Sequence, residues 1–172
     1  MRQTPTPPHI SPVSPQGRDL RSLRYAEHFL TWALRTSVAC SPHCRMLQRE
    51  FVHAFGPEPS EGLRAFHGWL LALSRGRRRL EIGRPGLITL TRDEEMLLSL
   101  LTAAQTGEAG RFTAQARFIM GAEPGEALYA AAHALMDLMD RRGHGLPIPK
   151  ESRRDLPAVT PCAGQAPRLK AV

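Results

Sequence analysis

The chain has 172 residues, the length of one domain, and a composition that is 42% hydrophobic excludes a wholly disordered protein. Only 6% of the residues are aromatic, so a core must be built mostly from Leu, Ala and Met, which favours helix over sheet. The formal net charge of +7 lies mostly outside the centre, because residues 1–18 carry +2, residues 144–172 carry +3 and residues 19–143 carry only +2.

Proline marks both ends of the chain. Residues 1–18 contain five prolines, and because each one removes a backbone donor and blocks helix, this segment is predicted to be a disordered tail. It has no apolar stretch of the kind that forms a secretory signal. Residues 144–172 contain five more prolines and are predicted to form a second, basic disordered tail. Residues 19–143 are therefore expected to form a single helical domain.

Three helices are expected in the first half of this domain. Asp19 is placed to cap a helix over residues 19–39, whose leucines fall mainly on one face. A serine followed by a proline is a typical helix start, and it predicts a second helix over residues 41–55 that a Gly-Pro pair ends. A third helix is predicted over residues 60–75.

The periodicity of the sequence changes after the third helix. Over residues 77–90, Leu80 and Ile82 alternate with charged residues, a Gly-Arg-Pro-Gly turn follows, and a second apolar run ends the segment. Alternation with a period of two around such a turn predicts a β-hairpin.

Three more helices complete the expected domain. Thr91 and Glu94 fit a capping box, in which each side chain satisfies a backbone amide of the other residue at a helix start. The helices expected from this point cover residues 91–106, 108–120 and 124–142. The predicted fold is mainly α, a compact bundle of about six helices with one β-hairpin after the third helix.

Three residues at the junction of the first two helices have side chains that can bind zinc. Cys40, His43 and Cys44 offer two thiolates and one imidazole, whereas a structural zinc site needs four ligands. Because there is only one closely spaced cysteine pair, we favour a buried, apolar role for Cys44 and a helix-end position for Cys40. Cys162 makes the cysteine count odd, which argues against a disulfide framework. No cofactor or required metal is expected.

The histidines do not suggest a catalytic arrangement. Glu50 and His53 have the Glu-x-x-His spacing of di-iron bundles, but the second copy is missing because Ala130 stands three residues before His133. His67 follows Phe66 and is interpreted as a residue at the edge of the core. The sequence contains neither a glycine-rich nucleotide motif nor a nucleophile elbow. These observations favour a non-enzymatic protein over an enzyme.

The expected hairpin is basic. Five arginines in and beside the segment, against Glu81 alone, give a local charge of +4; they are Arg75, Arg77, Arg78, Arg79 and Arg84. Two helices followed by a basic hairpin are typical of winged-helix proteins, in which the hairpin reaches the nucleic-acid backbone. The preceding helix is mostly apolar, however, and offers few side chains that could read bases. Charge on a hairpin also protects a solvated edge against aggregation.

The sequence favours a non-enzymatic protein-interaction or regulatory module in the cytoplasm, with a protein partner bound by a helix groove or by the tails. The longest nearly apolar run, residues 96–104, is far shorter than the roughly 20 residues that span a bilayer, so no membrane partner is expected. The alternative is a winged-helix-like DNA- or RNA-binding protein that uses the five arginines, and a metal-dependent enzyme ranks third. An exposed apolar groove would indicate the interaction module, and a shared basic face would indicate the nucleic-acid-binding protein. A pocket of titratable groups would indicate the enzyme.

Overall fold

Six α-helices make up most of the described chain. The computed structural model describes residues 17–40, 44–56 and 59–148. A short 3-10 turn, η1 (Leu20–Ser22), precedes the helices, which are α1 (Tyr25–Ala39), α2 (Arg45–Phe55), α3 (Pro59–Leu73), α4 (Arg92–Gln105), α5 (Ala109–Met120) and α6 (Glu126–Arg141). The predicted mainly helical, compact fold is confirmed.

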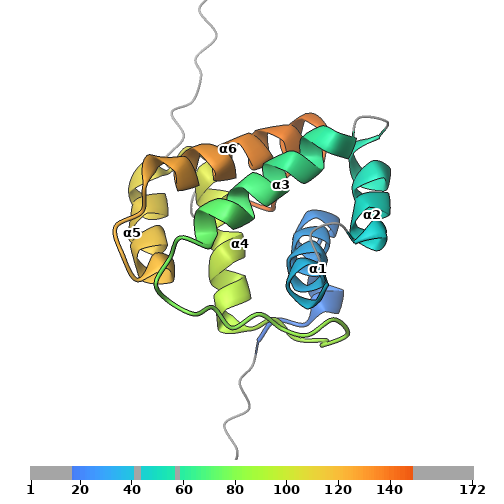
Figure 1. Ribbon diagram of the computed structural model, residues 1–172, viewed down its shortest axis with the longest axis horizontal. Coiled ribbons are helices and arrows are strands. Elements are labelled where there is room, and N and C mark those ends of the chain that lie inside the picture. Colours follow the sequence, from blue (N-terminus) through green and yellow to red (C-terminus); the bar gives the residue numbers. More distant parts are fainter. Residues whose placement is uncertain (1–16, 41–43, 57–58, 149–172) are drawn as a thin grey trace, which may run out of the picture.

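The helices pack around one shared core (Figure 1). α3 and α6 lie side by side, α4 packs against α5 and α6, and α2 packs against α3. α1 contacts both α2 and α4. Aromatic rings fill the core where α1, α2 and α3 meet, and they belong to Phe29, Phe51, Phe55, Phe66 and Trp69. Leucine, alanine and methionine fill the core between α4, α5 and α6, as the composition predicts.

The first helix begins later than predicted. Asp19 does act as a cap, but of the η1 turn, where its carboxylate accepts the backbone N–H of Arg21 at 2.8 Å. α1 then begins after Arg24, whose backbone N–H donates to the Glu27 carboxylate at 3.0 Å. The predicted helix start at residues 41–42 lies outside the described residues, and α2 begins after Cys44.

The start of α4 follows the prediction closely. The Thr91 hydroxyl accepts the backbone N–H of Glu94 at 3.1 Å, and the Glu94 carboxylate accepts the backbone N–H of Thr91 at 2.8 Å. The capping box read from the sequence is therefore confirmed.

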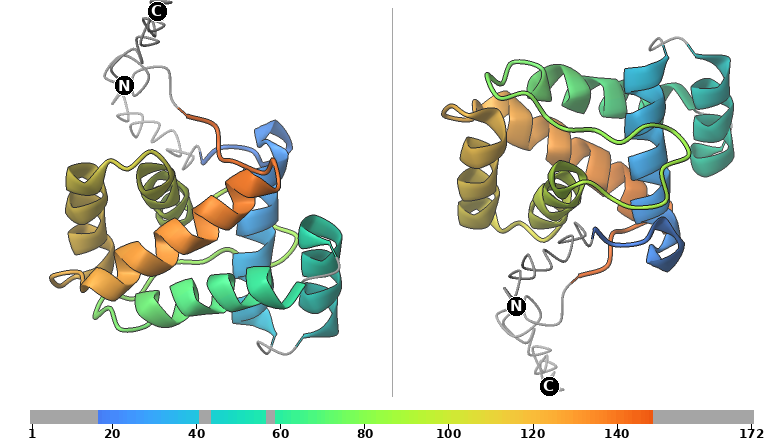
Figure 2. Two further views of the ribbon diagram at one scale, coloured as in Figure 1. Left: turned by 90° about the horizontal axis from the view of Figure 1, so that it is seen from above. Right: turned by 90° about the horizontal axis from the view of Figure 1, so that it is seen from below.

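The predicted hairpin over residues 77–90 is wrong. Within the described part of the chain this segment forms no strand, and its one β-bridge joins Thr89 to Asp19. Its backbone pairs with the segment before α1, since Leu20 N–H donates to Ile88 O at 2.8 Å and Leu90 N–H donates to Arg18 O at 2.9 Å. Other peptide groups of the segment bond to buried side chains of α1 and α4, so they are not available to a hairpin ladder. Figure 2 shows the segment as an irregular loop that crosses α1.

The packed chain continues beyond the end of α6. Leu146 is buried, and its backbone N–H and C=O bond to the side-chain amide of Gln105 at 2.8 and 3.1 Å. The His144 ring lies against Tyr25, with its Nε2 3.0 Å from Ala54 O. These contacts lie past residue 143, the boundary expected from the sequence.

Candidate functional site

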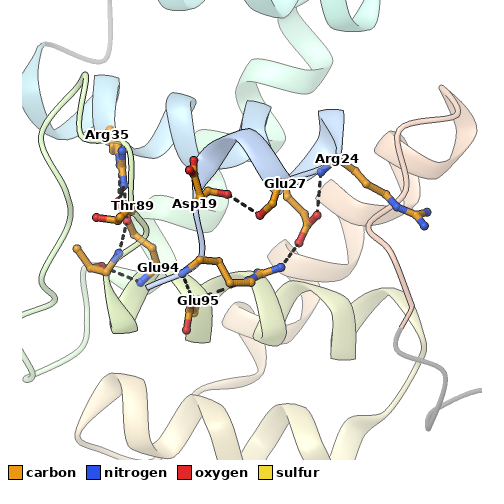
Figure 3. Close-up of polar contacts among 10 residues, drawn as sticks. Asp19, Arg24, Glu27, Arg35, Thr89, Glu94 and Glu95 are labelled. Carbon is orange, nitrogen blue, oxygen red and sulfur yellow. Dashed lines mark hydrogen bonds and ion pairs between the residues drawn. The ribbon is translucent and has the colours of Figure 1, made fainter. Parts of the chain in front are cut away.

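A buried ion pair joins α1 to α4 and to the loop of residues 77–91. The Arg35 guanidinium donates to both oxygens of Glu94 at 2.7 Å, and both side chains are almost fully buried. Its remaining donors bind Leu87 O at 2.6 Å and Thr89 O at 2.8 Å (Figure 3). The name Arg35 clamp is used below for Arg35 and Glu94 together with the peptide groups that these two side chains bind. The clamp fixes the loop against α1.

Carboxylates at the start of α4 hold the backbone of the same loop. Glu94 also accepts the backbone N–H of Gly83 at 3.0 Å, and Asp93 accepts that of Glu81 at 2.8 Å. Burial by itself would raise the pKa of Glu94, but the bonds from Arg35, Thr91 and Gly83 outweigh it and hold that pKa below its ordinary value. Glu94 is therefore ionised at neutral pH and can retain all of these donors.

The clamped loop forms one wall of a hollow on the surface of α1. This hollow of about 420 Å³ lies between the loop and α1. Its apolar lining comes from η1, α1 and the loop, and it consists of Leu20, Leu23, Trp32, Pro85, Leu87 and Ile88. Arg21 and His28 are its main exposed polar side chains.

A second hollow of about 420 Å³ lies on the other side of α1, against α2. It is lined by Tyr25, Phe29, Met46, Glu50 and His53, together with the two residues that line the first hollow as well, His28 and Trp32. The two hollows are therefore neighbours along α1, and His28 and Trp32 line both of them. We call the surface of both hollows, from Leu87 and Ile88 to Met46 and His53, the α1 groove.

Several exposed side chains of the α1 groove are apolar. Ile88 is 53% exposed and Met46 is 52% exposed, although neither side chain is polar. Tyr25 and Leu87 are exposed beside them. Isolated exposed hydrophobic residues are common, but a hollowed patch of several such residues is typical of interaction surfaces.

The five arginines predicted to bind nucleic acid do not gather at one tip. The backbone N–H groups of Arg77 and Arg78 bond to Met120 O at the end of α5, whereas residues 85–88 lie against α1. The Arg78 side chain pairs with Asp93 at 2.7 Å and stacks over the Phe118 ring. Arg75, Arg77, Arg79 and Arg84 are exposed. The loop runs from the end of α5 to α1, so Arg77 and Arg78 lie near its first end, whereas Arg84 precedes the part that lies against α1. Figure 1 shows this course of the loop.

The weak zinc candidates lie where α1 ends and α2 begins. Cys40 is exposed at the end of α1, and Cys44 is half-buried at the start of α2. His43 lies outside the described residues. Within the described ranges, no three His, Cys, Asp or Glu side chains come together in a way that could hold a metal ion.

The other histidines are dispersed. His53 and Glu50 line the α1 groove, whereas His133 is exposed on α6, near the Tyr129 ring. His67 is half-buried beside Phe66.

The α1 groove was not visible in the sequence as a site. Trp32 and Ile88 are distant along the chain, and each taken alone is an ordinary apolar residue. The one available signal was Arg35, a charged residue in a helix whose other side chains are mostly apolar. A buried arginine requires a carboxylate partner, and such a partner would have pointed to contacts between distant segments.

Comparisons of this chain with protein-family models, with curated proteins and with solved structures found no match. Among the described helices, none has the length and apolar character needed to cross a membrane.

Proposed function

We propose that this protein is a peptide-binding interaction module, and that the α1 groove binds an amphipathic segment of a partner protein. The observation that carries this proposal is that two largely apolar hollows lie next to each other along α1 and share Trp32 in their linings. A groove of this form can accept the apolar side chains of one face of a helix or of an extended peptide.

The rigidity of the groove supports binding. The loop wall is fixed by the buried Arg35 clamp, with four side-chain hydrogen bonds of 2.6–2.8 Å. A wall that is already ordered loses little conformational entropy when a ligand binds. Trp32, at the centre, offers a large and stiff contact area of the kind found at binding hot spots.

The charges around the groove indicate which partner would fit. Arg21 lines the hollow beside the loop and has no carboxylate partner among the described residues, while Arg84 is exposed next to Pro85 of the same wall. Of the described residues that line the groove, Glu50 is the one carboxylate, and it lies in the other hollow. We therefore expect a partner segment with apolar anchors and a carboxylate that lies near Arg21.

The nucleic-acid alternative has less support from the arrangement of side chains. A shared basic face would be needed, and the arginines of the loop are spread between α5 and α1. Among the α3 side chains that the structure describes, the exposed positions are Glu61, Arg64, Gly68 and Leu71, which offer a single basic side chain for base contacts.

The proposal is tested by selecting random peptides on phage against the full chain. We expect enriched sequences to combine regularly spaced apolar residues with Asp or Glu. A synthetic enriched peptide should change the tryptophan fluorescence of the protein. The change can be assigned to Trp32, because the other tryptophan, Trp69, is only 1% exposed. The Ile88→Asp variant should bind this peptide at least about tenfold more weakly.

Leu71→Asp is the matched control, because Leu71 is 62% exposed on α3 and does not line the groove. This variant should bind the peptide as the parent does. The proposal fails if no sequence is enriched, or if the enriched peptide binds the Ile88→Asp variant with unchanged affinity.

A further inference from the structure

Two thiols lie at neighbouring helix ends, at the junction of α1 and α2. Cys40 follows the last residue of α1, and Cys44 precedes the first residue of α2. The two side chains contact each other, since the Cys40 thiol is one of the groups that bond to Cys44. Cys40 is exposed to solvent and Cys44 is half-buried against the core. This pair is therefore placed for chemistry that involves both sulfur atoms.

The surroundings of Cys44 favour its ionised form. Hydrogen bonds from the backbone N–H groups of Leu47 and Met46 lower the pKa of the Cys44 thiol, partial burial opposes them, and the contact with Cys40 adds to the lowering. The N–H groups belong to the first turn of α2, where the positive end of the helix dipole also stabilises an anion. Cys40 follows the C-terminal end of α1, where the helix dipole is negative. We therefore expect Cys44 to be the more reactive of the two thiols.

We propose that Cys40 and Cys44 form a redox-modification site, in which a hydroperoxide oxidises Cys44 and Cys40 then closes a reversible disulfide between α1 and α2. The proposal does not depend on the peptide-binding function, because it concerns a chemical change that is measured without any partner.

The reaction proceeds in two balanced steps. The Cys44 thiolate attacks one oxygen of hydrogen peroxide, so an S–O bond forms, the O–O bond breaks, and the departing hydroxide takes up a proton to give water. The Cys40 sulfur then attacks the sulfur of Cys44, so the S–S bond forms and the S–O bond breaks. The proton that Cys40 releases joins the departing hydroxide as a second water. The two thiols are oxidised and the peroxide is reduced; an external dithiol reverses the change by exchange.

The test treats the full chain with equimolar hydrogen peroxide, alkylates the remaining thiols and maps them by mass spectrometry after tryptic digestion. Cys40 and Cys44 fall in one tryptic peptide, residues 36–45, and Cys162 falls in another, residues 155–168. We expect the first peptide to lose the mass of two hydrogen atoms and to escape alkylation, and to recover both thiols after treatment with dithiothreitol. Cys162 should remain alkylated, and it serves as the internal control.

Two variants separate the roles of the thiols. In Cys40→Ser, oxidised Cys44 has no partner, so it should accumulate as a sulfenic acid that dimedone traps. In Cys44→Ser, Cys40 should react with peroxide at least about tenfold more slowly than Cys44 does in the parent chain. The proposal is overturned if Cys162 is oxidised as fast as the pair, if no internal disulfide forms, or if the two variants react alike.

Discussion

Two ion pairs of the same chemistry stand in opposite environments in this protein. Arg35–Glu94 and Arg117–Glu123 both pair two guanidinium nitrogens with two carboxylate oxygens, at 2.6–2.8 Å. The side chains of the first pair are 3% and 1% exposed, and those of the second are 60% and 66% exposed. The two pairs differ in burial and in their other contacts: Glu94 also accepts the backbone N–H groups of Gly83 and Thr91, whereas water can solvate either partner of the second pair when the other is removed.

We expect Glu94→Gln to lower the free energy of unfolding by about 3 kcal/mol, since it leaves the buried Arg35 charge without its counter-ion. Glu123→Gln is the control, and it should leave the free energy unchanged within the error of the measurement. Urea denaturation of the three proteins at neutral pH measures both effects. Equal effects of the two substitutions would show that the Arg35 clamp is not a buried, desolvated pair in solution.

The acid sensitivity of the fold should depend on the same residue. Burial alone would raise the pKa of Glu94, but the hydrogen bonds from Arg35 and the loop amides outweigh this effect. The pKa of Glu94 therefore lies below the ordinary value of 4.5. The ionised carboxylate therefore stabilises the fold above about pH 4.5, and this contribution is lost as the pH falls through the lower pKa of the folded state. The stability difference between the parent and Glu94→Gln should shrink in that acid range. Denaturation curves at a series of pH values would contradict this if the difference stayed constant.

At the scale of single elements, the loop of residues 77–91 depends on a glycine for its close approach to α1. A Cβ atom added to Gly83 would lie 2.8 Å from Nη2 of Arg35, and the residue is buried. Gly83→Ala should therefore destabilise the protein by displacing the guanidinium. Gly68 on α3 has open space around it, so Gly68→Ala should stabilise the protein by up to about 1 kcal/mol through helix propensity alone. Thermal unfolding of the two variants should show shifts of opposite sign, and shifts of the same sign would contradict this account.

The sequence predicted those elements whose signals are local. The capping box of Thr91 and Glu94 and the helical periodicity each involve residues within one or two turns, and both appear in the structure. The hairpin prediction was wrong because alternation and a turn motif take account of one segment only. In the structure, the carbonyls of Leu87 and Thr89 accept hydrogen bonds from Arg35, which lies more than 40 residues earlier in the chain. The α1 groove was hidden for the same reason, since its walls come from three separate segments.

At the scale of the whole molecule, the C-terminal residues of the described chain close the core. Leu146 is only 3% exposed and shares two hydrogen bonds with Gln105, while His144 lies against Tyr25 of α1. A chain that ends at residue 143 should therefore be less stable by about 3 kcal/mol, from the apolar area and hydrogen bonds that it loses. A chain that ends at residue 148 keeps these contacts and is the control. Urea denaturation that gave the two truncated chains the same stability would show that these contacts add little.

The Arg35 clamp also limits the insertions and deletions that the loop of residues 77–91 can tolerate. Irregular loops usually tolerate inserted or deleted residues, because few of their peptide groups have fixed partners. Here the N–H groups of Glu81, Gly83 and Thr91 and the carbonyls of Leu87 and Thr89 are each assigned to a particular side-chain atom. One added residue between Gly83 and Leu87 would bring different peptide groups to Arg35 and move Ile88 away from Trp32. This loop therefore has the length constraint of a regular strand, although its bonds run to side chains rather than to a neighbouring strand.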